Sequence, residues 1–179
     1  MVWRIITDEL LERCKSGERN FNGIELIRIV GEMGERDGVS GLITGLEGAD
    51  LQGISLRGAN LEDVDLSGAN LTGSDLFGAY LGGAGLVKTI LRDANLFSAN
   101  LSNANLTGAD LTKANLSHVK AVGTVFIGAK IGYFQRADLT HADFRDSDVN
   151  GEGLCRKFNV IWHTTMPDGT IQEGPYCVW

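Results

Sequence analysis

A leucine occupies every fifth position from Leu46 to Leu116, fifteen times without a miss. Two positions before most of these leucines stands a small side chain, usually alanine, and Asp or Asn commonly separates the two. A period of five fits neither the 3.6-residue period of an amphipathic helix nor the two-residue period of a strand. The chain must therefore turn once per unit. Four units close a square coil in which the leucine and the small residue point inward.

Such coils stack through backbone hydrogen bonds about 4.8 Å apart. Residues 46–154 predict about five and a half coils and a rod roughly 26 Å long. Beyond Leu116 the phase continues to Ile131, and three extra residues around 132–136 then shift it to Leu139. Each coil buries its leucines only against its neighbours, so both ends of the stack need covering. The predicted fold class is an all-β solenoid, a quadrilateral β-helix.

Glycine is the unusual feature of the composition, with 24 glycines against 2 prolines. This excess indicates a backbone that turns often and repetitively. A length of 179 residues is that of one ordinary domain, so we expect a single continuous core.

Residues 1–17 predict a short N-terminal helical cap, with Thr7 as N-cap and a Ser16-Gly17 stop. The β-helix is expected over residues 18–154, because Phe21 is already in phase with the leucines. Within it, residues 31–40 lose the apolar centre and predict an irregular excursion from the coil.

Residues 155–179 are expected to form a C-terminal cap. Residues 158–163 alternate as a strand does, and a Pro-Asp-Gly turn at 167–169 predicts a hairpin after it. We expect Trp162 to cover the last coil, together with Tyr176 and Trp179.

The chain is acidic, with a net charge of −7 and a pI of about 4.9. This disfavours direct nucleic-acid binding, which needs clustered Lys and Arg. No apolar run approaches 18 residues, and the first residues have no basic and then apolar leader. A cytoplasmic protein with no membrane segment is expected.

The three cysteines are too few for a disulfide scaffold or a spaced zinc site. Cys155 and Cys177 could pair across a C-terminal hairpin. Free thiols are the expectation for a chain without an export signal.

No group of residues predicts catalysis, a cofactor or a metal. His118, His141 and His163 fall at different phases, and His141-Ala-Asp143 is interpreted as two solvated outward residues. No nucleotide-binding glycine motif is present. A convex rod also has no cleft in which catalytic groups converge, so we predict that the protein is not an enzyme.

One column of outward residues stands out. Positions twenty apart stack, which places Arg57, Phe77, Phe97 and Ser117 on one line. Tyr80 is expected to point outward on the next face. Such a stripe can be a docking site for a partner, or a stack of rings that stiffens the rod.

The units Gly-Ala-Asn-Leu-Glu at 58–62, Gly-Ala-Asn-Leu-Thr at 68–72 and Gly-Ala-Asp-Leu-Thr at 108–112 closely resemble the pentapeptide-repeat family. The resemblance implies a right-handed quadrilateral β-helix. The resemblance is to members that are abundant in photosynthetic bacteria, many of which have no assigned partner. It also implies, from the gyrase-protecting branch, that loops leaving the helix matter for function. By that analogy, residues 31–40 and 132–136 are places to look for function.

The leading hypothesis is a non-enzymatic protein-interaction scaffold with an unknown partner. One alternative implied by the resemblance is a DNA-mimicking modulator of DNA gyrase, since residues 46–154 carry 13 acids and 8 bases; the many outward Asn and Lys side chains weaken it. Another is a regulator of a transcription factor or its signalling. Relatives also suggest a homodimer through the C-terminal end. The candidate interaction surface comprises Arg57, Phe77, Tyr80, Phe97, Tyr133 and Arg136.

Overall fold

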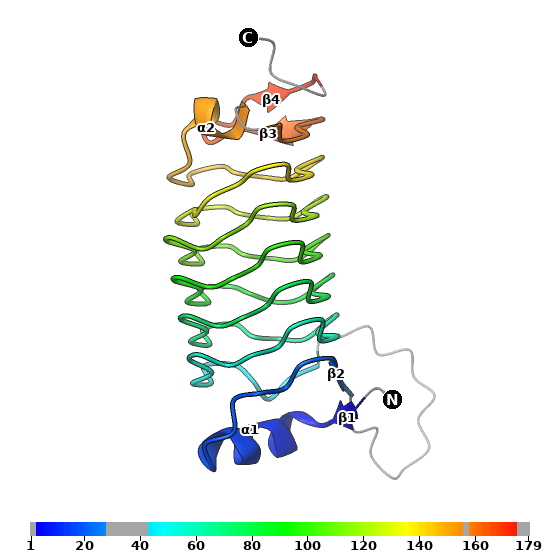
Figure 1. Cartoon of the computed structure of the whole chain (residues 1–179). Coiled ribbons are helices and arrows are strands. Elements are labelled where there is room, and N and C mark those ends of the chain that lie inside the picture. The colour runs from blue at the N-terminus through cyan, green and yellow to red at the C-terminus, as the bar shows by residue number, and fades with distance from the viewer. Residues whose placement is uncertain (1–2, 28–42, 156–157, 175–179) are drawn as a thin grey trace, which may run out of the picture.

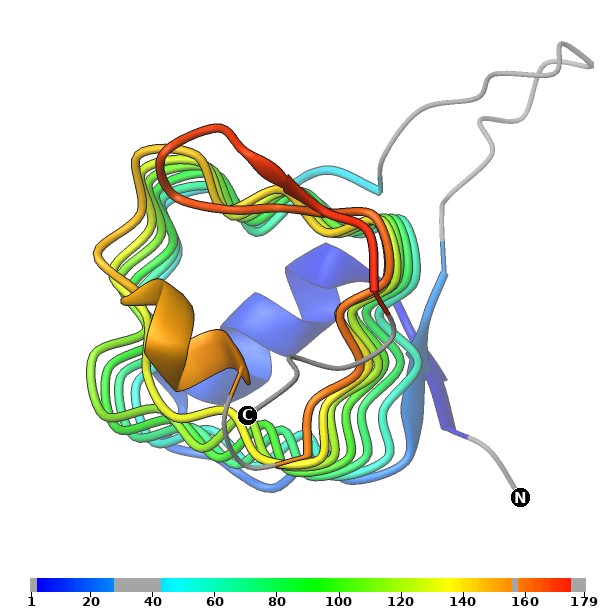
Figure 2. The same ribbon diagram turned by 90° about the horizontal axis from the view of Figure 1, so that it is seen from above.

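The computed structural model describes residues 3–27, 43–155 and 158–174, which form one stack of coils (Figure 1). Seen along the stack, the coils superimpose in a four-sided outline (Figure 2). The excursion expected at residues 31–40 lies outside the described residues.

Successive coils pair in parallel at a spacing of twenty residues, from Asp50 with Asn70 to Asp110 with Lys130. Each pairing is an isolated bridge rather than a long strand, because the chain turns again after two or three residues. The Leu51 N–H donates to the Asn70 carbonyl at 2.9 Å, and the Asn70 N–H donates back to the Ala49 carbonyl at 2.9 Å. These bonds join each coil to the next along the rod.

A β-turn forms each corner of a coil. In the first regular unit, the Ala49 N–H donates to the Leu46 carbonyl at 3.1 Å, and Gly48 between them has a φ of 66°. A positive φ at the third residue of a turn favours glycine, which has no Cβ to clash. The glycine excess thus reflects the repeated corners, although twelve of the described residues other than glycine, Lys88 and Asp93 among them, adopt the same positive φ.

The leucines and the small residues fill the interior, as the spacing predicts. Leu56, Leu61 and Ala59 are each exposed by 1% or less. Where the small position holds threonine, the buried hydroxyl donates to a leucine carbonyl of the coil before, as in Thr89 to Leu66 at 2.8 Å.

At the N-terminal end, β1 (Trp3–Ile5) pairs in parallel with β2 (Ile24–Leu26), and α1 (Thr7–Lys15) joins them. Figures 1 and 2 show α1 lying across the end of the stack, within the outline of the coils. It buries Leu10 and Cys14, one helical turn apart, in the core. The prediction of Thr7 as N-cap is wrong: the helix begins at Thr7, and no side chain caps it.

The phase shift near residue 132 also differs from the prediction. Asn115 pairs with Tyr133, a spacing of 18, so this coil is two residues shorter rather than three longer. Phe134, exposed by 5%, takes the inward central position that the sequence reading gave to no residue. Gly132 allows the shortcut, because a Cβ there would lie 2.6 Å from the Leu111 carbonyl oxygen.

At the C-terminal end are α2 (Gly151–Cys155) and the antiparallel pair β3 (Thr164–Thr165) and β4 (Ile171–Gln172). The hairpin therefore forms where the Pro-Asp-Gly turn predicts one. The alternating strand expected at 158–163 does not form. Asp138 pairs with Val160 and Asp143 with Thr165, so these residues continue the coil stack.

Trp162 does not cover the end of the stack, because it points outward and is 42% exposed. Tyr176 and Trp179 lie outside the described residues. Cys155 is disulfide-bonded, so the prediction of a free thiol there is wrong, while Cys14 is free and buried. Cys177 also lies outside the described residues.

Candidate interaction surface

One corner of the rod carries a line of stacked cationic and aromatic side chains. The Arg57 guanidinium carbon lies 4.3 Å from the centre of the Phe77 ring. The Phe77 and Phe97 rings are stacked, with centres 5.6 Å apart and planes 3° from parallel. The next contact is Phe97 with His118, at 4.9 Å and 41°. Four side chains from four successive coils thus form one continuous stack.

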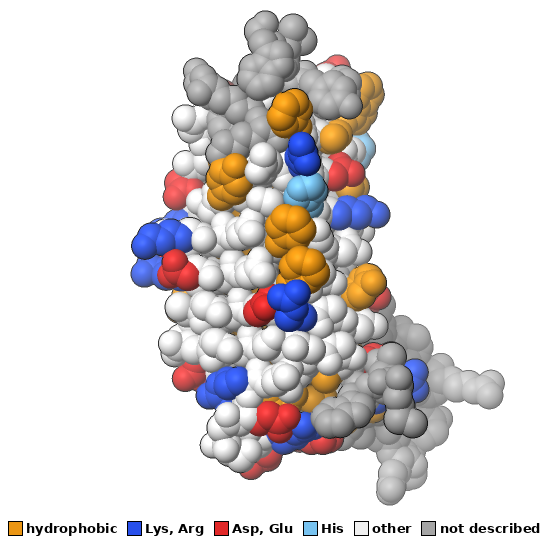
Figure 3. Space-filling model, in the orientation of Figure 1, with side chains coloured by type: hydrophobic (Ala, Val, Ile, Leu, Met, Phe, Trp, Pro, Cys, Tyr) orange, Lys and Arg blue, Asp and Glu red, His pale blue; other side chains and the backbone are white. Residues whose placement is uncertain are grey.

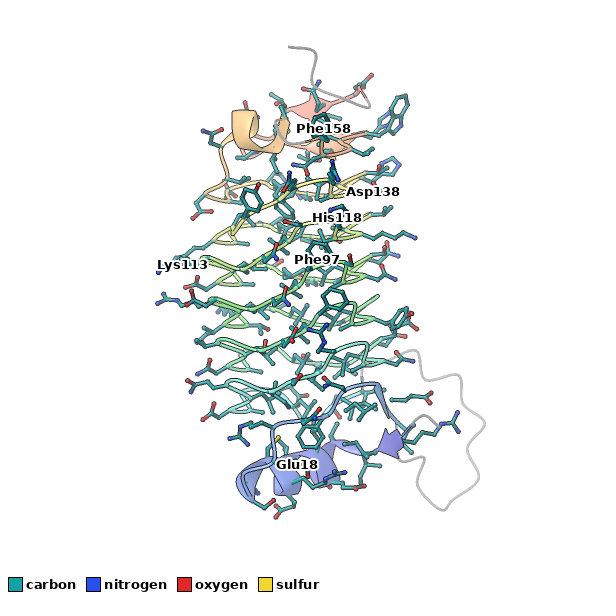
Figure 4. All side chains as sticks on the ribbon, viewed as in Figure 1. Glu18, Phe97, Lys113, His118, Asp138 and Phe158 are labelled. Atoms are coloured by element: carbon teal, nitrogen blue, oxygen red, sulfur yellow. The ribbon has the colours of Figure 1, made fainter. Side chains whose placement is uncertain are left out.

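The backbone register extends this line toward the C-terminal end. Lys120 pairs with Asp138, and Asp138 with Val160. His118, Arg136 and Phe158 each stand two residues before one of these paired residues, so they also follow one another along the rod. Figure 4 shows Phe97, His118 and Phe158 in this order along one side of the rod. We call the six side chains the ladder: Arg57, Phe77, Phe97, His118, Arg136 and Phe158.

The ladder residues occupy two neighbouring positions of the five-residue unit. Phe77 and Phe97 directly follow an inward leucine, whereas His118, Arg136 and Phe158 occupy the next position, where φ is 57°, 52° and 63°. Ser117, which the sequence placed in the column, is only 7% exposed. From His118 onward, the ladder side chains therefore come from the second residue after the central position of the unit and no longer from the first.

An ion pair holds the N-terminal end of the ladder. Arg57 donates to Asp75 Oδ2 at 2.8 Å, and the Asn95 amide donates to Asp75 Oδ1 at 3.0 Å. Burial by itself raises the pKa of Asp75, but hydrogen bonds from Arg57 and the Phe77 N–H outweigh it and leave the pKa below its ordinary value. Asp75 is thus a charged anchor that fixes the guanidinium over the Phe77 ring.

Two tyrosines flank the ladder. Tyr80 pairs with Asn60 and Asn100 along the rod, as predicted, and is 52% exposed. Tyr133, two residues before Gln135, is 42% exposed, and its hydroxyl donates to the Gln135 side chain at 3.3 Å. Each belongs to the column of bridge residues on its own side of the ladder.

Apolar side chains gather along this side of the molecule (Figure 3). Phe77 is 37% exposed and Phe158 is 70% exposed. Arg136 is exposed and belongs to no ion pair formed among the described residues. The surface therefore combines uncovered rings with a cation that is available to a partner.

All six residues of the predicted interaction surface lie on this side of the rod, in or beside the ladder. His118 and Phe158 were missed. His118 lies 21 residues after Phe97, one more than the regular spacing of twenty, so the sequence column passed through Ser117 instead. Phe158 could be assigned to the column only after the structure had shown the length of the short coil.

A hollow of about 420 Å³ adjoins the ladder near β2. Its lining includes Glu25, Glu62, Asn60 and Tyr80. Glu25 is already paired with Arg4 at 2.7 Å. Among the described residues, no group of three or more His, Cys, Asp or Glu could hold a metal ion. In the same part of the chain, no helix is long and apolar enough to span a bilayer.

The fold and this surface define a class of protein: a solenoid of five-residue units that displays columns of side chains on a rigid rod. The sequence profile of pentapeptide repeats matches residues 46–83, 74–112 and 89–128, with eight copies. The chain belongs to the pentapeptide-repeat family, whose fold is a right-handed β-helix.

Solved structures of pentapeptide repeat proteins are similar to this chain. One from Nostoc PCC 7120 is 26% identical, covers 89% of this chain and 97% of its own, and has a TM-score of 0.48. One from the cyanobacterium Cyanothece 51142 is 22% identical, with 80% and 95% covered and a TM-score of 0.43. One from the Arabidopsis thaliana thylakoid lumen is 30% identical, with 66% and 84% covered and a TM-score of 0.37. No curated protein matches the chain.

Proposed function

We propose that this protein is a non-enzymatic interaction module that binds a protein partner through the ladder and its flanking tyrosines. The observation that carries the proposal is the continuous stack from Arg57 through Phe77 and Phe97 to His118, which Arg136 and Phe158 follow in the backbone register. Aromatic residues and arginine are the types that dominate protein interfaces, and the partly exposed Phe158 and Tyr80 offer large apolar area.

The N-terminal half of the ladder is already ordered before any partner arrives. Stacking fixes Phe77 and Phe97, and Asp75 fixes Arg57. Side chains that are already ordered lose little conformational entropy on association. The stacked rings also stiffen the rod, so the two roles that the sequence left open are compatible.

The absence of an enzymatic role is part of the proposal. Among the described residues, each carboxylate whose pKa is displaced is lowered, by a hydrogen bond from an arginine or from a neighbouring turn residue, as for Asp143 with Arg145 and Asp168 with Thr170. Such shifts arise from surface ion pairs and turns. A catalytic acid or base would need a displaced pKa in a cleft.

The gyrase-modulator alternative receives little support from the charge pattern. Asp75, Asp110 and Asp143 each lie within 2.8 Å of an arginine nitrogen, so the acidic field of the rod is partly neutralised. Dose-dependent inhibition of supercoiling by purified gyrase, with none from a β-helix of equal charge, would establish that alternative. No single structural feature favours the transcription-factor alternative.

The sequence predicts an N-terminal cap at 1–17, the β-helix at 18–154 and a C-terminal cap at 155–179; we propose the first of these limits, whereas the pairing of Asp143 with Thr165 extends the coil stack beyond 154. The burial of Leu10 and Cys14 against the core supports the first of these. A variant lacking residues 1–17 should aggregate or form dimers through the uncovered coil. If the truncated variant is monomeric and as stable as the full chain, residues 1–17 do not act as a cap.

The sequence predicts a cytoplasmic location and a homodimer through the C-terminal end. We keep the homodimer as a proposal. The disulfide at Cys155 argues against the cytoplasm, since such bonds persist in oxidising compartments. Cell fractionation and sedimentation of the full chain decide the two points.

The test of the interaction role uses a photo-crosslinking residue in place of Phe158 in the source cells. A matched probe replaces Lys113, which is exposed and lies away from the ladder in Figure 4. The protein captured by the Phe158 probe alone is then purified, and its affinity is measured for Arg136→Glu and for Lys113→Glu. We expect Arg136→Glu to weaken binding roughly tenfold or more, with no change for Lys113→Glu. Equal affinities for the wild type and Arg136→Glu would refute the assignment of this surface.

A further inference from the structure

Two of the three histidines lie one above the other on the corner that follows the ladder. The rings of His141 and His163 have centres 5.3 Å apart and planes 22° from parallel. Their coils are joined at this point, because the His141 N–H donates to the Trp162 carbonyl at 2.8 Å. Nothing in the sequence signals this pair, since the two residues are separated by the whole of one coil.

Both imidazoles are open to solvent and have ring nitrogens free to bind. His141 and His163 are exposed, and neither side chain makes a hydrogen bond or an ion pair with the residues that the structure describes. Gly123 lies beneath His141 on the same corner, as the bond from its N–H to the Thr140 carbonyl shows. The side chain that approaches this corner from below is Asn103, whose Oδ1 lies 2.7 Å from the place that a Cβ of Gly123 would take.

We propose that His141 and His163 form a bidentate site for a late first-row transition-metal ion, with Cu²⁺ bound most tightly. Neutral imidazole suits zinc, copper and nickel, and affinity for the divalent ions peaks at Cu²⁺. With metal–nitrogen bonds of about 2.0–2.1 Å, two imidazoles on one ion have ring centres roughly 5 Å apart. The observed distance between the ring centres matches this value, but the rings are stacked nearly parallel, so each exposed ring must rotate about χ2 to direct a nitrogen to the ion.

Two protein ligands make the site an exchangeable one. Structural zinc sites use four protein ligands, whereas sites with fewer keep positions for water or another molecule. The remaining positions at His141 and His163 therefore belong to water. This inference does not depend on the interaction role of the ladder, which lies on a different corner.

Trp162 provides a built-in probe of the site. Its ring centre lies 5.1 Å from that of His163, with the planes at 68°. A paramagnetic Cu²⁺ ion bound beside His163 will quench the fluorescence of Trp162. Because the other tryptophans also emit, the Trp162→Phe variant identifies the share of the signal that comes from this residue.

The experiment titrates CuCl₂ into the untagged full-length protein and follows tryptophan fluorescence, with bound copper counted by equilibrium dialysis. We expect one Cu²⁺ per chain. His141→Ala and His163→Ala should each lower the association constant roughly tenfold or more. Trp162→Phe should lose the quenching and keep the copper. Circular dichroism confirms that each variant is folded.

His118→Ala is the matched control, because His118 occupies the same position of its turn, with a φ of 57°, and has no second imidazole above it. Its association constant should equal that of the wild type. Copper binding that survives in the His141→Ala/His163→Ala double variant, or that is weakened equally by His118→Ala, overturns the proposal.

Discussion

At the scale of single residues, the fold depends on the small inward position of each unit. Alanine fills it without a polar atom, and threonine fills it only by donating its hydroxyl to a carbonyl, as Thr124 does to Leu101 at 2.7 Å. Ser74 occupies the same position, is 1% exposed, and its hydroxyl has no hydrogen-bond partner among the described residues. A buried hydroxyl without a partner destabilises the folded state.

Replacing Ser74 by alanine should therefore raise the free energy of unfolding by about 1 kcal/mol. The change restores the side chain that most other units carry. Thr89→Val is the opposite case, because it removes a hydroxyl bonded to the Leu66 carbonyl; it should lower stability by about 1 kcal/mol. Urea denaturation measures both, and a destabilised Ser74→Ala variant would show that the hydroxyl has a partner.

Asp110 should make the protein sensitive to acid. Its side chain is 15% exposed, and burial alone would raise its pKa, but bonds from Thr112 and Arg92 outweigh burial and lower the pKa from 3.8 to about 2. Because the folded-state pKa lies below the unfolded one, the carboxylate stabilises the fold above about pH 4 and loses that effect as the pH falls toward 2. NMR titration of the carboxyl checks the value, and Thr112→Val should move it upward.

The sequence predicted the residues of the core and most of the ladder, because both follow from a strict period. Leu46 to Leu116 fixed which side chains point inward, and the spacing of twenty brought Phe77 above Arg57. It could not predict His118, since two neighbouring positions of a turn can both reach the same column. Only the side-chain packing shows which one does.

At the scale of elements, the unit of the fold is the coil and not the strand. Each coil contacts only the coils next to it, so stability is a sum of neighbouring interfaces. Sequence phase alone leaves the length of an irregular coil undetermined: three residues more and two residues fewer place Leu139 identically when the period is five. The bridge between Asn115 and Tyr133 decides for the shorter coil. The same ambiguity concealed the alignment of Phe158.

Removing one whole coil should leave a shorter folded rod. Deletion of residues 86–105 joins Gly85 to Leu106 and preserves the twenty-residue register observed in the bridges. We expect a cooperative unfolding transition with a lower midpoint, because one interface is lost. The matched deletion of 86–103 leaves two surplus residues between Leu81 and Leu106, in a part of the rod where every coil has the regular spacing of twenty. Circular dichroism should show a strongly destabilised or aggregated chain. Equal behaviour of the two would contradict the coil as the unit.

The short coil should depend on Gly132. A Cβ at this position would overlap the Ala114 carbonyl oxygen and lie 2.6 Å from that of Leu111, both backbone atoms that cannot move aside. Gly132→Ala should therefore lower the free energy of unfolding by about 2–3 kcal/mol. Gly82→Ala is the control, because the nearest atom there is 3.5 Å away, and its effect should stay within about 0.5 kcal/mol. Thermal and urea unfolding of the two variants make the comparison.

At the scale of the whole molecule, the rod presents different chemistry on different corners. One corner carries the ladder, and the next carries the pair His141 and His163. The net charge of −7 does not describe the ladder corner, where Asp75 is paired with Arg57 and Arg136 is exposed. The acidic composition disfavoured direct nucleic-acid binding. The ladder and the pair of histidines could be found only from the arrangement of the coils.

The disulfide at Cys155 should be present in the protein as isolated. After denaturation without reductant, iodoacetamide should label Cys14, which is free, and leave Cys155 unlabelled. Peptide mass spectrometry reads both sites, and a sample reduced beforehand is the control in which both are labelled. Full labelling of Cys155 without reductant would return this cysteine to the thiol state that the sequence predicted.

The hydrogen bonds between coils run along the rod, and this has a mechanical consequence. α1 and β4 lie at opposite ends of the stack (Figure 1), so a force that separates them pulls the bonds of one coil interface apart together and then passes to the next interface. Each regular coil that opens releases twenty residues, which is roughly 70 Å of extended chain. Under tension the molecule would lengthen in steps of one coil, and the coil shortened at Gly132 would give the smallest step.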